Sequence, residues 1–322
     1  MKLSKYILLL LILISSSLFF SCKGGDKDMK KNNYVISKVA PIKSVPKTIV
    51  SVSPAITSIL FDLDAGDKLI GRTDFCTYPP QVKNIKSIGG INNANLEMII
   101  SMQPDLVITS SIFTKKMFEI IESSKIPIIS FKETNEIEGM YDIIEVLGEI
   151  LDKKEKANEI ISDCKTRLQE IKSKRQKIES KKESTESKKE STESKKEFAK
   201  SKKENHNMPK VYYVIGYGQS GDYSAGKDTY IHQIITLAGG DNIAKNSINW
   251  SFSTEELFSQ QPDFIFIRME DSANFVNTYP YTKLNAVKNN KVFGIESSLM
   301  DLQTPRSIKA IEFISEILYH LK

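Results

Sequence analysis

Short apolar runs alternate with segments of helical spacing in the first part of the chain. Four runs are predicted to be strands: 49–52, 68–71, 106–108 and 127–130. Three segments are predicted to be helices: 55–63, 96–102 and 115–124. Short buried strands that alternate with helices are typical of a mostly parallel sheet covered on both faces. We therefore predict an α/β lobe over residues 47–135.

A second region with the same alternation begins at residue 209. Strands are predicted at 211–215, 264–267 and 292–295, and helices at 229–238 and 305–321. Gly239 and Gly240 follow the first of these helices, and glycine commonly ends a helix. We predict a second α/β lobe over residues 209–322.

Residues 136–179 have a different pattern. Apolar residues recur at helical spacing from Ile137 to Ile171, and a break is expected near Asp152. This stretch shows no strand pattern, so we predict a connecting helix between the two lobes.

Residues 180–208 form a low-complexity insert rich in Lys, Glu and Ser. The heptad SKKESTE at 180–186 is repeated at 187–193, but neither copy has the apolar positions of a coiled coil. The insert is expected to be either a solvated extension of the connecting helix or a disordered loop. A functional polybasic site is the alternative, although the interleaved glutamates argue against it.

The positive charge of the chain is local. Residues 172–204 contain 13 Lys or Arg and 7 Asp or Glu, a net charge of +6, against +5 for the whole chain. A nucleic-acid-binding protein needs basic residues across its binding face. The charge distribution therefore argues against a nucleic-acid partner.

The N-terminal segment has the features of an export signal. Lys2 and Lys5 precede an apolar region that is too short, and too soon interrupted, for a permanent membrane span. We interpret residues 1–21 as a lipoprotein signal peptide and Cys22 as the lipidated residue, with an uncleaved anchor helix as the alternative. Residues 22–46 are expected to be a flexible tether. The protein would then be exported and held at the cell membrane, facing the periplasm or the exterior.

One motif occurs in both lobes. Residues 97–105 and 255–263 both read E-x-[IL]-[IF]-S-x-Q-P-D, and each copy precedes a predicted strand. A glutamate in the first turn of a helix is favoured by the helix dipole, which would explain either Glu97 or Glu255 alone. Two such glutamates in matching positions indicate paired acidic groups on one face of the molecule.

Several further motifs, in this order and spacing, carry a family resemblance. They are Ser53-Pro54-Ala55, Tyr78-Pro79-Pro80, Asn95-Leu96-Glu97, Ser224-Ala225-Gly226-Lys227, Ala238-Gly239-Gly240-Asp241, Trp250 with Ser253-Thr254-Glu255, and Pro305-Arg306. Over residues 47–322, apart from the insert, the sequence resembles the periplasmic binding proteins for cobalamin and ferric siderophores, which serve ABC importers. The resemblance implies two α/β lobes with mostly parallel sheets, joined by a single long connecting helix, with the ligand in the cleft between them.

The resemblance also implies the partners. Glutamates at the positions of Glu97 and Glu255 dock into arginine pockets of the membrane permease in that family, one from each lobe. The expected partners are therefore an ABC permease with its ATPase, a small-molecule metal chelate and, through the lipid anchor, the membrane. We expect a monomer that has no catalytic residues, no cofactor and no resident metal.

The ligand is expected to be a cobalamin-type corrinoid or a ferric siderophore. The resemblance suggests ligand contacts at Phe75, Tyr78, Tyr217, Trp250 and Arg306. Phe75 and Tyr217 are equally well explained as packing residues, and Arg306 as a surface cation. Haem or another metal chelate is the alternative ligand, although 89–91 lacks the tyrosine that haem-binding relatives often have there.

Other functional classes fit less well. The chain contains no P-loop, G-x-S-x-G or H-E-x-x-H motif, which argues against an enzyme. His206, His232 and His320 are scattered, so a zinc or manganese importer subunit is disfavoured. A structural or adhesive lipoprotein would explain the signal and the repeat but not the family motifs. Cys76 and Cys164 are expected to be free thiols.

Overall fold

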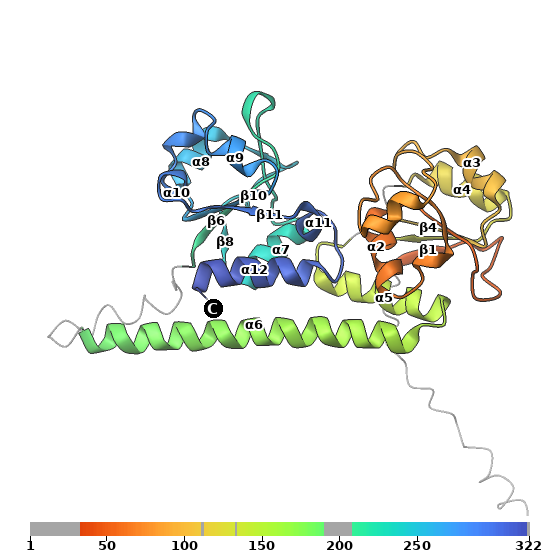
Figure 1. Cartoon of the computed structure of the whole chain (residues 1–322), viewed down its shortest axis with the longest axis horizontal. Helices are drawn as coiled ribbons and strands as arrows, with labels where there is room; N and C mark the ends of the chain where they lie inside the picture. Colours follow the sequence, from red (N-terminus) through yellow and green to blue (C-terminus); the bar gives the residue numbers. More distant parts are fainter. Residues whose placement is uncertain (1–32, 111–112, 133, 190–207, 321–322) are drawn as a thin grey trace, which may run out of the picture. The chain divides into compact units, whose positions relative to one another are not determined.

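The computed structural model describes residues 33–110, 113–132, 134–189 and 208–320 (Figure 1). The region that begins at Asn33 forms one compact unit. The predicted signal peptide, Cys22 and most of the insert lie outside the described residues. Among the described residues, none of the helices combines the length and apolar character needed to cross a bilayer.

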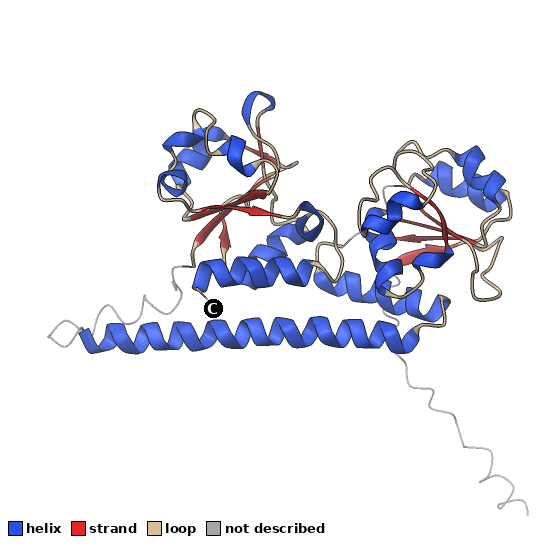
Figure 2. Cartoon of the chain, viewed as in Figure 1, coloured by secondary structure: helices blue, strands red, loops and turns tan. Residues whose placement is uncertain are grey.

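The first lobe is built on a five-stranded sheet in the order β1-β5-β4-β2-β3. Its strands are β1 (Tyr34–Ile36), β2 (Ile49–Ser51), β3 (Leu69–Arg72), β4 (Leu106–Ser110) and β5 (Ile128–Phe131). The last four are parallel, as the alternating pattern predicts. Helices cover the sheet on both sides (Figure 2).

Strand β1 lies inside the range that we expected to be tether. It pairs antiparallel with β5, so that Tyr34 lies opposite Phe131, and their ring centroids are 5.9 Å apart. Three residues are too few to show a strand period in the sequence, and only the neighbouring strand provides their hydrogen-bond partners. The first lobe therefore begins near residue 34 rather than residue 47.

Three helices of the first lobe begin at residues whose side chains accept a backbone hydrogen bond. They are α2 (Pro54–Asp62), α3 (Leu96–Met102) and α4 (Lys115–Ser123), and two short 3₁₀ helices, η1 (Gly66–Lys68) and η2 (Pro80–Asn84), complete the lobe. The capping side chains are Ser53, Asn95 and Thr114. These caps fix where each helix leaves its strand.

The second lobe repeats this architecture with a four-stranded parallel sheet in the order β11-β10-β6-β8. Its strands are β6 (Lys210–Val214), β8 (Asp241–Asn242), β10 (Phe264–Arg268) and β11 (Val292–Ile295), and β7 (Asp222–Tyr223) pairs separately with β9 (Ser251–Phe252). Its helices are α7 (Tyr230–Ala238), α8 (Thr254–Gln260), α9 (Ser272–Phe275), α10 (Asn285–Lys288), α11 (Ser297–Met300) and α12 (Ser307–Tyr319), with 3₁₀ helices η4 (Gly218–Ser220) and η5 (Tyr281–Lys283).

The predicted connecting segment is divided at the expected place. Helix α5 (Ile137–Ile150) ends before Asp152, whose φ is 56°, and α6 (Lys154–Lys189) begins two residues later. Gly148 lets the two helices approach, because a Cβ there would lie 2.5 Å from the Cβ of Ala157. Helix α6 also takes in residues 180–189, so the start of the insert adopts the helical alternative.

The long helix α6 joins the two lobes and lies along α5, α7 and α12 (Figure 1). Its buried residues Ala157, Cys164 and Ile171 belong to an apolar cluster that also contains residues of both lobes. Cys164 and Cys76 are both buried free thiols, as expected.

Two arginines of α6 fasten it to the second lobe. Arg167 donates from Nε and Nη2 to the two carboxylate oxygens of Glu312, at 2.7 and 2.6 Å. Arg175 donates from Nη1 to the carbonyl oxygen of Leu237 at 3.0 Å, near the end of α7, where the helix dipole favours a cation. Both contacts lie at the edge of the apolar cluster.

Replacing Arg167 with Ala should lower the free energy of unfolding by about 1–2 kcal/mol, because a two-pronged, partly buried ion pair is lost. Urea unfolding would measure this change. Lys172→Ala, an exposed position on the same helix, is the control and should change stability by less than about 0.5 kcal/mol. Equal stability of the two variants would show that the Arg167–Glu312 pair does not hold α6 in place.

Candidate functional site

A cavity of about 420 Å³ is lined by residues of both lobes. This volume lies in the range of small-molecule sites. Phe131, at the end of β5, and Ser110, at the end of β4, line it from the first lobe. Ligands of open parallel sheets bind at this carboxyl edge, so the position of the cavity follows from the sheet topology.

Most of the cavity wall is apolar. The first lobe contributes Ile56 and Ile91, the middle of α5 contributes Ile143, and the second lobe contributes Tyr230 and Trp250. Aromatic rings on such a wall offer large flat contact surfaces.

Trp250 is held in an unusual backbone conformation. Its φ is 66°, in the left-handed region that residues with side chains rarely adopt. Its carbonyl oxygen accepts a hydrogen bond from the backbone N–H of Ser224 at 2.8 Å, and the adjoining strand β9 pairs with β7. The residue remains 44% exposed, so the indole is held at the cavity without being buried by the protein.

Two glutamines of the second lobe bond to the start of α5. Gln303, a cavity residue, donates from Nε2 to the carbonyl oxygen of Glu136 at 2.5 Å. The side-chain oxygen of Gln233 accepts a hydrogen bond from the backbone N–H of Ile137, also at 2.5 Å. These contacts join the second lobe to the segment that follows the first lobe, beside the cavity.

The charges of the described lining residues nearly cancel. Lys132 comes from the first lobe and Asp228 from the second, and both are exposed. A third charge, Asp301, accepts hydrogen bonds from Arg268 at 2.8 and 3.1 Å and from the hydroxyl of Tyr213 at 3.2 Å. Asp301 therefore has a counter-ion within the protein.

Of the five suggested ligand residues, the structure places only Trp250 at the cavity. Phe75 is 61% exposed, in the loop after β3, and is not a lining residue. The ring of Tyr217 contacts Phe275 and Tyr281 edge-on, with centroids 5.1 and 5.7 Å apart. Tyr217 therefore packs within the second lobe, in agreement with its alternative interpretation as a packing residue.

Arg306 and Tyr78 contact each other instead of the cavity. The guanidinium carbon of Arg306 lies 3.5 Å from the centroid of the Tyr78 ring, and Nη2 donates to Glu296 at 2.8 Å. Only 11% of the Arg306 side chain is exposed. Since Tyr78 belongs to the first lobe and Arg306 to the second, this stack is a contact between the lobes.

Asp62, at the end of α2, lies near the same contact. Burial raises its pKa to about 6, although Arg306, Lys309 and Lys156 act in the opposite direction. One carboxylate oxygen, Oδ2, has no hydrogen-bond partner among the described residues. The carboxyl group of the first lobe thus faces cations of α12 and α6 without a close contact to them.

Much of the repeated motif has a structural explanation. Gln103 and Gln261 both end their helices in the left-handed conformation, each with a φ of 46°. After each glutamine and proline, an aspartate accepts backbone hydrogen bonds. Asp105 accepts from Lys47 and Thr48 at 2.8 and 2.9 Å, and Asp263 accepts from Lys210 at 2.8 Å. The bonds at Asp105 lower its pKa.

The glutamates that open the motif are not used in this way. Glu97 follows the cap Asn95 in the first turn of α3, and Glu255 follows the cap Ser253 in the first turn of α8. Both side chains are exposed. The fold therefore accounts for the last residues of the motif and leaves the two glutamates exposed at the surface.

Comparison with known proteins identifies the family. The family model described as periplasmic binding protein matches residues 49–187 and 181–299. The chain belongs to this family. Its function is that of the substrate-binding component of an ABC importer, which acts outside the cytoplasm with a permease and a small ligand and carries out no catalysis.

Individual relatives differ in what they bind. An uncharacterized ABC transporter substrate-binding lipoprotein of Bacillus subtilis is 27% identical over 283 residues, which are 86% of this chain and 82% of that protein. A vitamin B12-binding protein of Vibrio campbellii is 27% identical over 277 residues, 83% and 88% of the two chains. A periplasmic heme-binding protein of Pseudomonas aeruginosa has a similar structure, with a TM-score of 0.70 at 18% identity over 86% and 94% of the chains.

Sequence reasoning missed most of the cavity residues. Phe131 and Lys132 directly follow a predicted strand, so the rule that ligands bind at the carboxyl edge would have found them. Tyr230 and Gln303 lie at the beginning of a helix and in a loop, and the sequence alone gives no signal that distinguishes them.

Replacing Asp62 with Asn should stabilise the protein at neutral pH. The pKa of Asp62 is raised from 3.8 to about 6, so the folded state binds this proton more tightly than the unfolded chain. Stability should therefore fall as the pH rises from about 4 to above 6, and Asp62→Asn should remove that loss of about 1–2 kcal/mol. Urea unfolding at pH values of about 4 and about 8 would test this.

The exposed Asp67→Asn is the control for this measurement and should leave the pH dependence unchanged. A variant Asp62→Asn that is less stable than the unchanged protein at the higher pH would contradict the prediction. It would mean that the attraction of Arg306 and Lys309 outweighs the burial of the carboxylate.

Proposed function

We propose that this protein captures a cobalamin-type corrinoid in the cavity between its lobes and delivers it to a membrane permease. The observation that carries the proposal is an aromatic and apolar wall with nearly balanced charge and few free polar groups. A ferric siderophore is the second candidate, and haem is the alternative.

The described lining residues favour a metal whose coordination is completed by the ligand itself. Haem iron usually takes an axial ligand from His, Tyr, Cys or Met of the protein. The described lining contains no His, Cys or Met, and its one tyrosine, Tyr230, donates its hydroxyl to the carbonyl oxygen of Met300 at 2.5 Å. A corrinoid or a siderophore chelate needs no such side chain.

The net charge of the ligand distinguishes a corrinoid from a ferric siderophore. Many ferric siderophore complexes are anionic and would require several cations in the cavity. The cavity offers Lys132, which is offset by Asp228, while Arg306 is stacked on Tyr78. The amide of Asn135 and the indole of Trp250 suit a flat ligand with an amide-rich edge, as a corrinoid has.

The remaining parts of the proposal concern delivery and location. We assign Glu97 and Glu255 to contacts with cationic pockets of the permease, supported by their exposure and their matching positions in two lobes. We assign Cys22 as the lipidated residue that anchors the exported chain. Charge complementarity of this kind sets the register of docking and speeds encounter.

Trp250 should report the ligand directly, because it is the sole tryptophan. Cobalamin should quench its fluorescence, and Trp250→Ala should weaken binding by about 5- to 150-fold if the ring stacks on the ligand. Tyr279→Ala is the matched control, since Tyr279 is 72% exposed and does not line the cavity. Full affinity of Trp250→Ala for cobalamin would place the ligand elsewhere. Parallel titrations with a ferric siderophore and with haem decide between the candidates.

Replacing both Glu97 and Glu255 with Gln should reduce uptake of labelled cobalamin by cells at least about tenfold, because charge-assisted contacts to the permease are lost. Cobalamin binding by the purified variant should stay unchanged, and stability should fall by only a few tenths of a kcal/mol. The control replaces Glu119 and Glu256, which are exposed glutamates outside these two positions. Normal uptake with both Glu97 and Glu255 changed to Lys would refute the docking role.

A further inference from the structure

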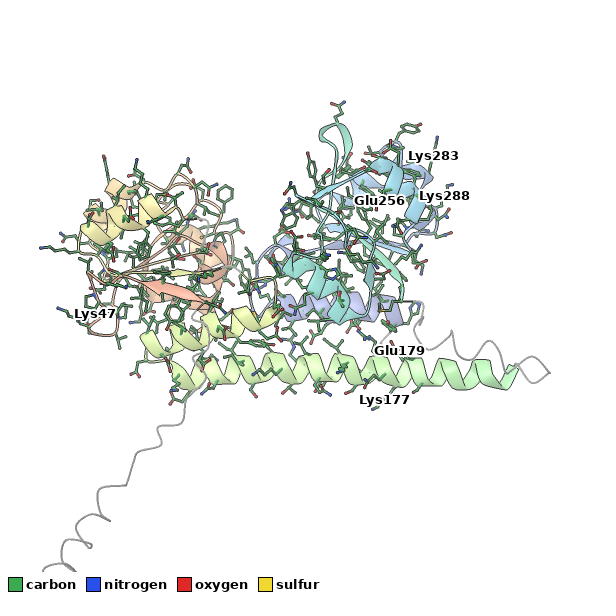
Figure 3. The ribbon with its side chains drawn as sticks, turned by 180° about the vertical axis from the view of Figure 1, so that it is seen from behind. Lys47, Lys177, Glu179, Glu256, Lys283 and Lys288 are labelled. Carbon is green, nitrogen blue, oxygen red and sulfur yellow. The ribbon has the colours of Figure 1, made fainter. Side chains whose placement is uncertain are left out.

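Three lysines in the second part of α6 take no part in the contacts described above. Lys172, Lys174 and Lys177 are exposed along this helix, at positions distributed around its axis. Figure 3 shows Lys177 pointing away from the second lobe, whereas Glu179 points toward it. The acidic side chain is thus turned toward the second lobe, and its Oε1 lies 3.6 Å from Nε of Arg175.

This charge is concentrated in one half of the helix. Residues 154–171 contain four Lys or Arg and four Asp or Glu, and so have no net charge. Residues 172–189 contain eight Lys or Arg and three Glu, a net charge of +5, which equals that of the entire chain. We call residues 172–189 the basic half of α6. The rest of the protein is neutral overall, so the basic half is the dominant positive feature.

The chain enters the compact unit close to this helix. The side-chain amide of Asn33 donates to Asp142 of α5 at 3.0 Å, and α5 packs along α6 through Gly148. Ten residues lie between Cys22 and Asn33, and the eleven Cα-to-Cα steps from one to the other span at most about 40 Å when fully extended. Helix α6, with 36 residues, is itself about 54 Å long. A lipid on Cys22 would therefore keep α6 within reach of the bilayer surface.

The two helices that carry the motif glutamates lie on the other side of their lobes. Figures 1 and 3 show α3 and α8 on the sides of the two lobes away from α6. Helices α3 and α8 therefore lie on the opposite side of their lobes from the basic half of α6. A surface in contact with α6 leaves both helices on the side away from it.

We propose that the basic half of α6 binds the anionic lipid headgroups of the membrane in which the chain is anchored. The inference rests on the proposed lipidation of Cys22. Lysines close to an anionic leaflet are attracted to it, and salt screens this attraction over about 10 Å. Bound in this way, the protein rests with α3 and α8, the helices that carry Glu97 and Glu255, on the side away from the membrane. It must then leave the lipid surface before it meets the permease.

The experiment measures sedimentation with lipid vesicles. The chain from residue 22 onward, with Cys22→Ala so that no acyl group is attached, is mixed with vesicles containing about one third phosphatidylglycerol or with phosphatidylcholine alone. The protein with an unchanged basic half should bind the anionic vesicles at about 50 mM salt and be released at about 500 mM salt. It should not bind phosphatidylcholine.

A triple variant and a matched control locate the contact. Lys172→Glu, Lys174→Glu and Lys177→Glu together should weaken binding to anionic vesicles at least about tenfold. The control carries Lys83→Glu, Lys86→Glu and Lys116→Glu, which change the net charge equally at exposed positions of the first lobe. The affinity of this control for anionic vesicles should fall by no more than about twofold.

The outcomes separate this inference from the proposed function. An equal loss in the two triple variants, or no binding of the starting protein to anionic vesicles, overturns the inference. Binding to soluble polyphosphate without binding to vesicles also overturns it, because the helix would then serve a different polyanion. Cobalamin titration of the same proteins is an independent readout. Retained cobalamin binding with failed vesicle binding rejects the membrane contact alone, and the reverse result rejects the proposed ligand alone.

Discussion

The burial of one face of α5 and α6 is the constraint on which the rest of the structure depends. The apolar cluster contains Ile59 and Ile108 of the first lobe, Ile144 of α5, Ile171 of α6 and Ile311 of the second lobe. An isolated helix as rich in Lys, Glu and Ser as α6 has little apolar surface to bury, and its inner face is stabilised mainly by tertiary packing. Two lobes joined by a shared core move by small adjustments of packed surfaces rather than by swinging on a free linker.

Polar side chains at the edge of this core lie in or beside the cavity and determine how polar it is. Gln303 and Gln233 form hydrogen bonds with the backbone at the beginning of α5. The charge of Asp301 is neutralised by Arg268. These groups have already found partners within the protein, so they add little attraction for a charged ligand. What remains accessible is chiefly the apolar wall and Trp250, which explains why shape and stacking decide the choice of ligand in our proposal more than charge does.

The two α/β lobes and the long connecting helix could be predicted because buried strands and amphipathic helices leave strong periodic signals. Strand β1 could not, since three residues show no period and Tyr34 is placed by Phe131, nearly a hundred positions away. The residues of the candidate site were harder to predict from the sequence than the fold. Trp250 was found because the family resemblance pointed to it, whereas Tyr217 and Arg306 share the same kind of sequence signal but pack against Phe275 and Tyr78. Which aromatic ring or cation faces a cavity depends on the packing of distant segments, which a single sequence does not encode locally.

The hydrogen bonds at Asp105 and Asp263 have a mechanical consequence. Each aspartate ties the segment after its helix, α3 or α8, to the beginning of a central strand in the same lobe, at Thr48 and Lys210. Helices α3 and α8 are therefore rigid parts of their own sheets, and neither shifts independently of its lobe. The distance between the Glu97 and Glu255 carboxylates is then set by the angle between the two lobes. A partner that contacted both carboxylates at once would therefore sense the angle between the lobes without entering the cavity between them.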